Sequence, residues 1–513
     1  MKVPVSFAAA LCVAAAALCG CGQKKVVPTG ATKRPLVTAM VIDYHGKPFT
    51  GDYAQEVFAK MTEYTNTDVE FTFASYDDYN ARVELLLKTP ELLPMIMHVN
   101  KFNMSVVDAA NNDEFWDLND FLWKKNGKKF KYPNLAQANK NVCENLSIVG
   151  RLFGLYKARD IGRYGLAYRT DWAEKLGLKK PESIEDVYNM LYAFTYGDPD
   201  GNGKDDTYGL SMCKYTGPFD IMQTWFGCGN DRVEENGTLV PVHDTAAYKE
   251  ALLWLRKIYA DGLIVPDWRN RETAAWKDQI RQGEAGVFID CIDVASNLWD
   301  YFTTNGVPSV VDPSQTASMT LVGAVNGHTL ATTGYNGFFV ITKAAKTEAQ
   351  VEACLHFLDK MCDNEMLLLG NYGLKDVHYI IDDGGFLIDT DIDNPASLNN
   401  YAQLNQAMCY IPRTYNDIQP YVKRSERKVQ EITVIKENEA YAVFNPATPY
   451  LMDSLAYAMM GEKLDALLTE ARNAYICGEL DDAGLEKAFE DWDTLGGAGL
   501  RVEVNTKRQQ KNR

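Results

Sequence analysis

The first hundred residues alternate between short apolar runs and segments with helical periodicity. Apolar runs predict three strands, over residues 36–42, 69–73 and 93–97. Two helices are predicted between them, one capped at Asp52 and one over residues 77–88. Strands that alternate with helices at this spacing are typical of a parallel sheet with crossover helices, so the pattern predicts an α/β fold.

The same patterns continue along the rest of the chain. Further strands are predicted over residues 152–156, 164–168, 286–290 and 338–342. Three more amphipathic helices are predicted to begin at the capping residues Ser183, Asp244 and Thr347. From Tyr401 onward the sequence is mainly helical, and the basic residues 507–513 are expected to fray.

Polar residues directly follow the first and third predicted strands. Ligands of parallel α/β sheets bind beyond the carboxyl ends of the strands. We therefore interpret Tyr44, His98 and Asn100 as candidate ligand contacts. An ordinary solvated loop residue is an equally good interpretation of each of them.

The segment 198–209, DPDGNGKDDTYG, carries the most specific chemical pattern in the chain. Its oxygen-bearing side chains fall at positions 1, 3, 5 and 9 of an EF-hand-like loop, as Asp198, Asp200, Asn202 and Asp206. Gly203 falls where the loop turns sharply with a positive φ, and Lys204 would offer its backbone carbonyl. Gly209 replaces the bidentate glutamate, so Thr207, a water or a remote carboxylate must complete the shell. The pattern predicts Ca²⁺, and the alternative is a polar surface turn.

Residues 1–20 have the form of a signal peptide, with Lys2 before an apolar stretch. The stretch ends in Leu-Cys-Gly-Cys, which resembles a bacterial lipobox, so Cys21 is predicted to carry the lipid. Residues 21–35 would then form a polar tether, with the protein at the extracytoplasmic face of the cell membrane. An uncleaved membrane anchor and a soluble secreted protein are the alternatives.

Length, charge and cysteine content narrow the function classes. The 513 residues suffice for two or three domains, and a net charge of −17 argues against nucleic acid as a partner. No run after the signal is long and apolar enough to cross a membrane. The cysteines after Cys21 show no CxxC or Cys/His metal spacing. Cys354 and Cys362 lie in an apolar helical stripe, which favours buried thiols over disulfides.

Several segments together resemble the extracellular solute-binding proteins of carbohydrate ABC transporters, in particular LplA-like and alginate-oligosaccharide-binding lipoproteins. Most of the resemblance lies in residues 152–209, where YRTDWAEKLGLKKPESIEDVYNMLYAF precedes the calcium-type loop. The other matching segments are residues 248–266, 283–290, 337–373 and 491–497, which include YKEALLWLRKIYADGLIVP, GEAGVFID, NEMLLLGNYG and DWDTLGG. They follow the order of the family over most of the mature chain.

The resemblance implies a periplasmic-binding-protein-like fold with two α/β lobes joined by a multi-crossing, type II-like hinge. Lobe 1 would comprise residues 36–164 plus 335–378, and lobe 2 residues 165–334 plus 379–500, leaving residues 501–513 as a tail. The crossings are expected near residues 162–167, 334–336 and 376–382. The chain is expected to be a monomer that binds an oligosaccharide or sugar derivative and delivers it to ABC permease subunits.

The resemblance also implies a structural Ca²⁺. Carried over to this chain, its ligands are Asp198, Asp200, Asn202, Asp206 and the carbonyl of Lys204. The alginate-binding relatives have a glutamate where this chain has Thr207, which leaves the sixth ligand open.

Candidate sugar contacts are aromatic faces and planar polar groups near the expected lobe junctions. We interpret Trp225 as an aromatic platform, with core packing as the alternative. Arg169 could donate hydrogen bonds to the hydroxyls or to a carboxylate of the ligand, although a structural ion pair is an equally good interpretation of this arginine. The remaining candidates are Trp172, Asp290, Trp299, Tyr335 and Asn336.

Two other functions fit the sequence less specifically. A polysaccharide-active enzyme would need paired carboxylates, and no GxSxG, HExxH or GxGxxG motif is present. A surface glycan-binding or adhesion lipoprotein without a transport role fits the signal and tether equally well.

Overall fold

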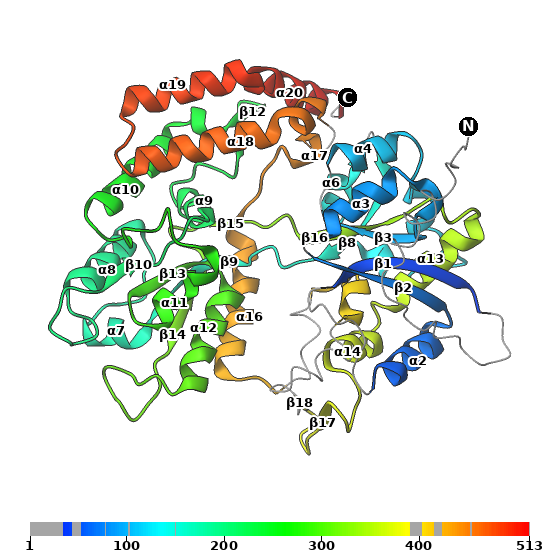
Figure 1. The fold of residues 1–513 in the computed structure, drawn as a ribbon, viewed down its shortest axis with the longest axis horizontal. Helices are drawn as coiled ribbons and strands as arrows, with labels where there is room; N and C mark the ends of the chain where they lie inside the picture. Colours follow the sequence, from blue (N-terminus) through cyan, green and yellow to red (C-terminus); the bar gives the residue numbers. More distant parts are fainter. Residues whose placement is uncertain are drawn as a thin grey trace, which may run out of the picture.

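The computed structural model describes residues 34–43, 53–76, 78–100, 103–148, 150–389, 403–414, 423–451 and 454–511. Two α/β lobes lie side by side, with the N-terminal strands in one and the green central elements in the other (Figure 1). The predicted two-lobed fold is confirmed. Among the described residues, no helix combines the length and the apolar character that a bilayer crossing requires.

Lobe 1 is built on a five-stranded sheet in the order β2-β1-β3-β16-β8. The strands are β1 (Leu36–Asp43), β2 (Asp68–Ser75), β3 (Ile96–Val99), β8 (Gly154–Ala158) and β16 (Tyr335–Ile341). β1 pairs in parallel with β2 and β3, as the alternating pattern predicts. β16 is antiparallel to both of its neighbours, so the sheet is mixed rather than purely parallel.

Helices surround this sheet and close one apolar core over it. They are α2 (Ala54–Thr65), α3 (Tyr79–Leu87), α4 (Met104–Asn111), α5 (Asn119–Leu122), α6 (Lys140–Asn145), α13 (Glu348–Lys360) and α14 (Asn364–Tyr372). The oxygen of Thr347 accepts a hydrogen bond from the amide of Gln350, which confirms it as the cap of α13. The N-cap of α2 is Tyr53, and the predicted cap Asp52 lies outside the described residues.

Lobe 2 contains a four-stranded sheet in the order β10-β13-β9-β14. Its strands are β9 (Tyr164–Arg169), β10 (Tyr208–Leu210), β13 (Ala285–Cys291) and β14 (Met319–Val322). Its helices are α7 (Thr170–Lys175), α8 (Ile184–Tyr196), α9 (Gly217–Thr224), α10 (Ala246–Ala260), α11 (Trp276–Arg281), α12 (Ile292–Asn305) and α16 (Glu426–Asn438). Ser183 and Asp186 form a reciprocal capping box at α8. The cap of α10 is Thr245, one residue after the predicted Asp244.

Short elements complete the two lobes. The small hairpins pair β4 (Lys125–Asn126) with β5 (Lys129–Phe130), β6 (Ser147–Ile148) with β7 (Arg151–Leu152), β11 (Arg232–Glu235) with β12 (Thr238–Pro241), and β17 (Tyr379–Ile381) with β18 (Leu387–Asp389). In addition, β15 (Thr329–Leu330) pairs with β19 (Ala442–Val443).

The C-terminal helices form a layer over lobe 2 (Figure 1). They are α17 (Thr448–Leu451), α18 (Leu455–Ile476), α19 (Asp482–Trp492) and α20 (Ala498–Lys511). The expected fraying is wrong for residues 507–511, because they continue α20, where Arg508 donates to the carbonyl of Gly237 at 2.8 Å and pairs with Glu234. Earlier in the same helix, Leu500 and Val504 are buried in a core with Trp492. These two apolar residues are one helical turn apart, so both face the same neighbour.

The chain passes between the lobes several times. It runs from β8 to β9 through residues 159–163 and returns to β16 through residues 331–334. The third crossing lies after Ile411 and before α16, not near residues 376–382 as expected. Leu404 and Met408 explain the difference, because they are buried in the core of lobe 1 and residues 404–411 therefore do not belong to lobe 2.

The first crossing is held against α16. The side-chain amide of Asn438 donates hydrogen bonds to the carbonyls of Gly162 and Tyr164, at 2.8 and 2.9 Å. A Cβ atom on Gly162 would lie 2.4 Å from the carbonyl oxygen of Ile435, so only glycine fits this approach. The crossing is therefore packed against lobe 2 at its far end.

The cysteines after Cys21 are free thiols. Seven of them are buried and Cys477 is partly buried. The prediction of buried thiols at Cys354 and Cys362 is confirmed.

Candidate functional site

Two sheet edges flank the hinge. In lobe 1, β1, β3 and β8 end at the same edge, because β16 is antiparallel to both β3 and β8. In lobe 2, β13 ends beside the start of β9, with Cys291 opposite Tyr164. Only five residues join β8 to β9, so the two edges lie close together. Ligands of α/β sheets bind at such carboxyl ends, and this region is the candidate site.

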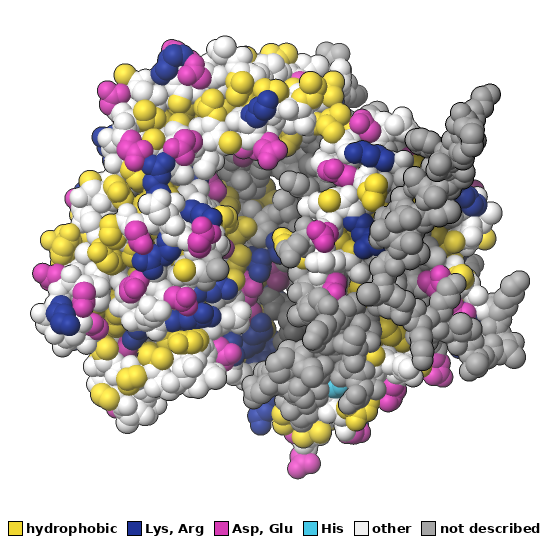
Figure 2. Space-filling view, in the orientation of Figure 1, with side chains coloured by type: hydrophobic (Ala, Val, Ile, Leu, Met, Phe, Trp, Pro, Cys, Tyr) yellow, Lys and Arg dark blue, Asp and Glu magenta, His cyan; other side chains and the backbone are white. Residues whose placement is uncertain are grey.

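The segment that joins the two edges is basic. Residues 157–163 read KARDIGR and place Lys157, Arg159 and Arg163 between the lobes. A groove separates the two lobes in the space-filling view, with Lys and Arg side chains along it over α12 and α16 (Figure 2). This local charge contrasts with the net charge of −17 of the whole chain.

Arg163 is fully paired within lobe 2. Its Nε and Nη2 each donate to one carboxylate oxygen of Asp293, both at 2.7 Å. Burial acts to lower the pKa of Arg163, but this bidentate ion pair outweighs it and raises the pKa. Asp293 lies in the first turn of α12, where the helix dipole also favours a carboxylate.

Asp290, a predicted contact, lies at the end of β13 and is 9% exposed. Its carboxylate accepts a hydrogen bond from the amide of Cys291 at 2.6 Å. Burial raises the pKa of Asp290 although this hydrogen bond opposes the shift. The residue thus lies at the hinge edge, and its role as a ligand contact stays a prediction.

Lys157 and Arg159 differ from Arg163 in their partners. The Lys157 ammonium donates to the side-chain oxygen of Gln406 at 2.7 Å, a neutral acceptor. Within the described part of the chain, neither Lys157 nor Arg159 forms an ion pair with a carboxylate. Burial lowers the pKa of Lys157 to about 7, and the nearby charge of Arg159 acts in the same direction. Burial and the charge of Arg163 lower the pKa of Arg159.

The segment around Gln406 also contacts the end of β1. The side-chain amide of Gln403 donates to the carboxylate of Asp43 at 2.8 Å, and both groups are buried. This bond links residues 403–411 to the lobe 1 edge of the candidate site. The adjacent candidate Tyr44 lies outside the described residues.

Arg169 and Trp172 are structural rather than ligand contacts, contrary to the expectation. Arg169 makes a buried bidentate ion pair with Asp171, at 2.9 and 2.7 Å. Its guanidinium also lies over the rings of Trp172 and Phe302. Trp172 is 1% exposed and meets Phe194 edge to face, so its ring has no free surface for a sugar.

Trp225 is also not the predicted platform. It follows α9 directly and its side chain is 0% exposed. The ring packs edge to face against Trp254 of α10, with 6.3 Å between ring centroids. The predicted alternative, core packing, is what the structure shows.

His98 is buried at the end of β3. Its ring packs against Phe339 and Tyr79, and burial lowers its pKa to about 3. Its Nε2 lies 3.4 Å from the carbonyl oxygen of Asn336. The expected ligand contact is therefore wrong, because the imidazole belongs to the lobe 1 interior.

Four other predicted contacts keep some exposed surface. The amide of Asn100 donates to Asn80 at 2.9 Å at the lobe 1 edge. Tyr335 is half-buried where the second crossing enters β16, and burial raises its pKa to about 12. Asn336 beside it is exposed, and Trp299 is half-buried on α12. Their contact with a ligand stays a prediction.

The calcium-type loop follows α8 as an exposed turn. Gly203 has a φ of 75°, which agrees with the sharp turn expected at this position. The amide nitrogen of Asn202 lies 2.7 Å from a carboxylate oxygen of Asp200 and 3.1 Å from one of Asp206. The amide of Gly203 donates to the carboxylate of Asp198 at 3.3 Å. The carboxylates of Asp200 and Asp206 thus lie around the side-chain amide of Asn202 within one turn, and carboxylate and amide oxygens are the ligands that a hard cation such as Ca²⁺ prefers.

Two details limit the set of metal ligands. The hydroxyl of Thr207 donates to the carbonyl of Phe194 at 2.8 Å and is buried, so it is not the sixth ligand. Across the described residues, no group of three or more His, Cys, Asp or Glu side chains is arranged to hold a metal ion. Three carboxylates with an amide and a carbonyl would therefore have to move inward on binding, with water completing the shell.

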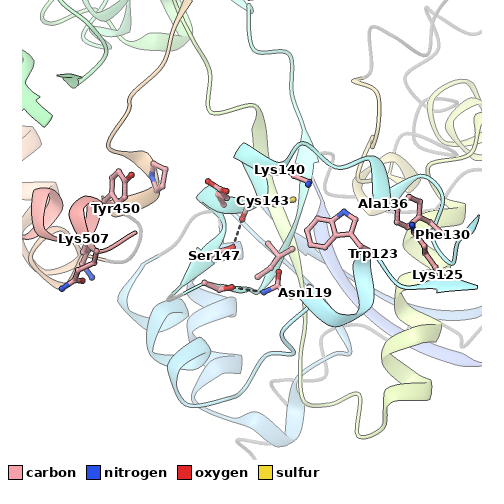
Figure 3. A pocket seen from close by; sticks show the side chains of 15 residues that line it. Asn119, Trp123, Lys125, Phe130, Ala136, Lys140, Cys143, Ser147, Tyr450 and Lys507 are labelled. Atoms are coloured by element: carbon pink, nitrogen blue, oxygen red, sulfur yellow. Dashed lines mark hydrogen bonds between the residues drawn. The ribbon is translucent and has the colours of Figure 1, made fainter. Parts of the chain in front are cut away.

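A cavity of about 1060 Å³ lies between lobe 1 and the C-terminal helices. Tyr450 and Lys507 lie across it from Trp123 and Asn119 (Figure 3). The side chain of Asn119 donates to the carbonyl of Gly150 at 2.9 Å, which fixes one edge of the wall. The space is large enough for a sugar unit and combines an aromatic face with polar groups.

Comparison with known proteins decides the family. The chain is 33% identical to lipoprotein LipO of Bacillus subtilis over 457 residues, which cover 87% of both chains. The chain belongs to the extracellular solute-binding proteins. It is also 26% identical to the polygalacturonan/rhamnogalacturonan-binding protein YtcQ of Bacillus subtilis, over 92% of this chain and 91% of that protein. No protein-family model matches the chain.

Solved structures of solute-binding proteins share the fold. An extracellular solute-binding protein from Bifidobacterium longum subsp. infantis superposes with a TM-score of 0.68 at 17% identity, over 93% of this chain and 99% of its own. An EF-hand mutant of the Streptococcus pneumoniae substrate-binding protein FusA, in complex with fructo-nystose, gives 0.63 at 17% identity, over 93% and 100%. The alginate-binding protein AlgQ2, solved without calcium ion, gives 0.62 at 16% identity, over 93% and 98%.

Sequence reasoning missed several residues at the hinge of this solute-binding protein. Lys157, Arg159, Arg163 and Asp293 received no role, although they lie between the two sheet edges. The available signal was the basic pattern KARDIGR between two predicted strands. Its place in the site depends on which strands pair, and the sequence pattern does not determine that pairing.

Proposed function

We propose that this protein is a lipid-anchored, monomeric receptor that captures an oligosaccharide between its lobes and delivers it to ABC permease subunits. The observation that carries the proposal is the pair of strand edges that flank several chain crossings. A ligand that contacts both edges stabilises the closed arrangement of the lobes by its differential affinity. The permease would then distinguish loaded from empty receptor by closure.

The names of the relatives support a sugar as the ligand. YtcQ is named as a polygalacturonan/rhamnogalacturonan-binding protein, and an EF-hand mutant of FusA was solved in complex with fructo-nystose. The test is a calorimetric binding screen of the purified soluble domain, residues 22–513, against oligosaccharides of different composition. We expect micromolar affinity, about −8 kcal/mol, for at least one of them. Binding of none, or cleavage of the bound glycan, would contradict the proposal.

We further propose that the loop at residues 198–209 holds a structural Ca²⁺ through Asp198, Asp200, Asn202, Asp206 and the carbonyl of Lys204. Two neighbours, an EF-hand mutant of FusA and the alginate-binding protein AlgQ2 solved without calcium ion, support calcium binding in proteins of this fold. A bound ion would cross-link one turn and thereby fix the connection between α8 and β10.

Calcium is therefore expected to stabilise the folded protein. Excess Ca²⁺ at about 100 times Kd adds about 2.7 kcal/mol, because only the folded state binds it. Removal with EGTA should lower Tm, and a double variant Asp198→Ala, Asp200→Ala should lose this response in a melting experiment. Asp312→Ala, in another exposed polar turn, is the matched control and should keep it. Identical melting curves of the native protein with and without calcium would refute the ion.

Lipid anchoring through Cys21 is proposed from the lipobox, and the name of lipoprotein LipO supports it. In the cell, Cys21→Ala should move the protein out of the detergent phase or leave it unprocessed, because no thiol remains for the lipid. Cys19→Ala is the matched control, since this residue leaves with the signal peptide. Phase partitioning with Triton X-114 measures the effect. A Cys21→Ala protein that matures and partitions like the native one would rule out this anchor.

A further inference from the structure

The charges at the first crossing are not balanced. Arg163 has Asp293 as its partner, and Arg427 of α16 has Asp300 at 2.9 Å. Lys157 and Arg159 have no such carboxylate among the residues that the structure describes. Both side chains are only partly exposed, and their charges act on each other.

An unpaired, partly buried cation carries a desolvation cost. A guanidinium that is withdrawn from water without a counter-charge destabilises the folded protein, and ionisable groups perturbed in this way cluster at functional sites. The lowered pKa values of Lys157 and Arg159 reflect this cost. A core position would not explain the two residues, because Lys157 and Arg159 lie where the strand edges of both lobes meet.

The two acidic groups nearest to the end of β13, Asp290 and Asp293, do not remove the imbalance. The charge of Asp293 acts to raise the pKa of Arg159, but both of its oxygens are already bound by Arg163. The carboxylate of Asp290 is held by the amide of Cys291 at 2.6 Å. The nearest polar partner of Lys157 is the neutral amide of Gln406.

We propose that the oligosaccharide carries a carboxylate, as in a uronic acid, and that Arg159 and Lys157 bind this carboxylate at the hinge. The inference rests on the proposed function and specifies its substrate class. The planar guanidinium of Arg159 can donate two parallel hydrogen bonds to a carboxylate. A carboxylate bound nearby favours the charged form of Lys157, which then supplies a second positive charge. Because both groups are partly withdrawn from water, a neutral sugar would leave their desolvation uncompensated.

The test compares acidic oligosaccharides with their neutral counterparts. Calorimetry of the soluble domain uses size-fractionated oligogalacturonates, oligoalginates and oligoglucuronates, each beside its carboxyl-reduced form. We expect at least one acidic oligosaccharide to bind about tenfold or more tightly than its reduced form, with an affinity that falls as salt is added. Arg159→Gln should weaken binding of that acid by about tenfold to a hundredfold and leave the reduced form within about twofold.

Two further variants test whether weaker binding by Arg159→Gln could come from misfolding. Lys157→Gln is an independent variant, and it should also reduce the preference for the acidic over the carboxyl-reduced oligosaccharide. Arg269→Gln is the matched control, because this arginine pairs with Glu470 and Glu479 at the surface of lobe 2. It should bind both forms as the native protein does.

The outcomes separate the inference from the proposed function. Binding of neutral oligosaccharides without a preference for the acid overturns the inference and leaves the function intact. An unchanged preference in Arg159→Gln and Lys157→Gln also overturns it, as does selective binding of a sulfated neutral oligosaccharide. Binding of no oligosaccharide of any kind contradicts both.

Discussion

Replacement of Trp225 by alanine is expected to lower the free energy of unfolding by about 3–5 kcal/mol, as is typical of a fully buried tryptophan. The indole is 0% exposed and packs against Trp254. Its removal leaves a cavity between α9 and α10 that neighbouring rings cannot fill. Chemical denaturation with urea measures the loss.

The same variant separates packing from recognition. Below its melting temperature, Trp225→Ala should bind the oligosaccharide within about twofold of the native affinity, because the ring has no surface to offer. Tyr192→Ala is the matched aromatic control, since Tyr192 is 50% exposed on α8 and should cost less than about 0.5 kcal/mol. Native stability together with lost glycan binding in Trp225→Ala would show that the ring is a sugar platform after all.

Asp171→Ala is expected to be as damaging, at about 3–5 kcal/mol, because it leaves a buried charge without its partner. The carboxylate of Asp171 accepts both hydrogen bonds of the Arg169 fork and a third from the amide of Val310, at 3.0 Å. The Arg169 side chain is only 5% exposed, so water cannot replace the lost acceptor.

A surface ion pair provides the comparison. Asp278→Ala breaks the pair between Asp278 and Arg281 on α11, whose side chains are 44% and 33% exposed, and should cost at most about 1 kcal/mol. The double variant Arg169→Met, Asp171→Leu should recover much of the loss, because apolar groups need no partner. Equal, small losses for Asp171→Ala and Asp278→Ala in urea denaturation would mean that the buried pair is not structural.

The strands and the main helices could be predicted from sequence because their signals are local. The continuous apolar run that forms β13 and the Ser183 cap of α8 both lie within the elements they define. The direction of β16 has no such signal, since it depends on pairing with β3, more than two hundred residues earlier. The same holds for residues 404–411, which join lobe 1 only through contacts with distant elements.

The candidate site was harder to predict for the same physical reason. Tryptophan in a loop-like sequence suits a sugar platform and a core equally well, and the decision at Trp225 comes from Trp254 on another helix. The sequence around Arg169 fits a ligand contact, but in the structure its guanidinium donates hydrogen bonds to Asp171, two residues away. Arg159 is a candidate contact because it has no carboxylate partner among the described residues. The order of residue types along the chain does not reveal which groups lie near each other in space.

Small-angle X-ray scattering with and without a bound oligosaccharide tests the central claim most directly. The soluble domain should be titrated with the tightest ligand from the binding screen, and the ligand should be recovered and weighed by mass spectrometry. Capture between two lobes predicts a smaller radius of gyration at saturation and a ligand of unchanged mass. An unchanged radius of gyration, or a ligand recovered as fragments, would contradict an oligosaccharide receptor that closes around its cargo.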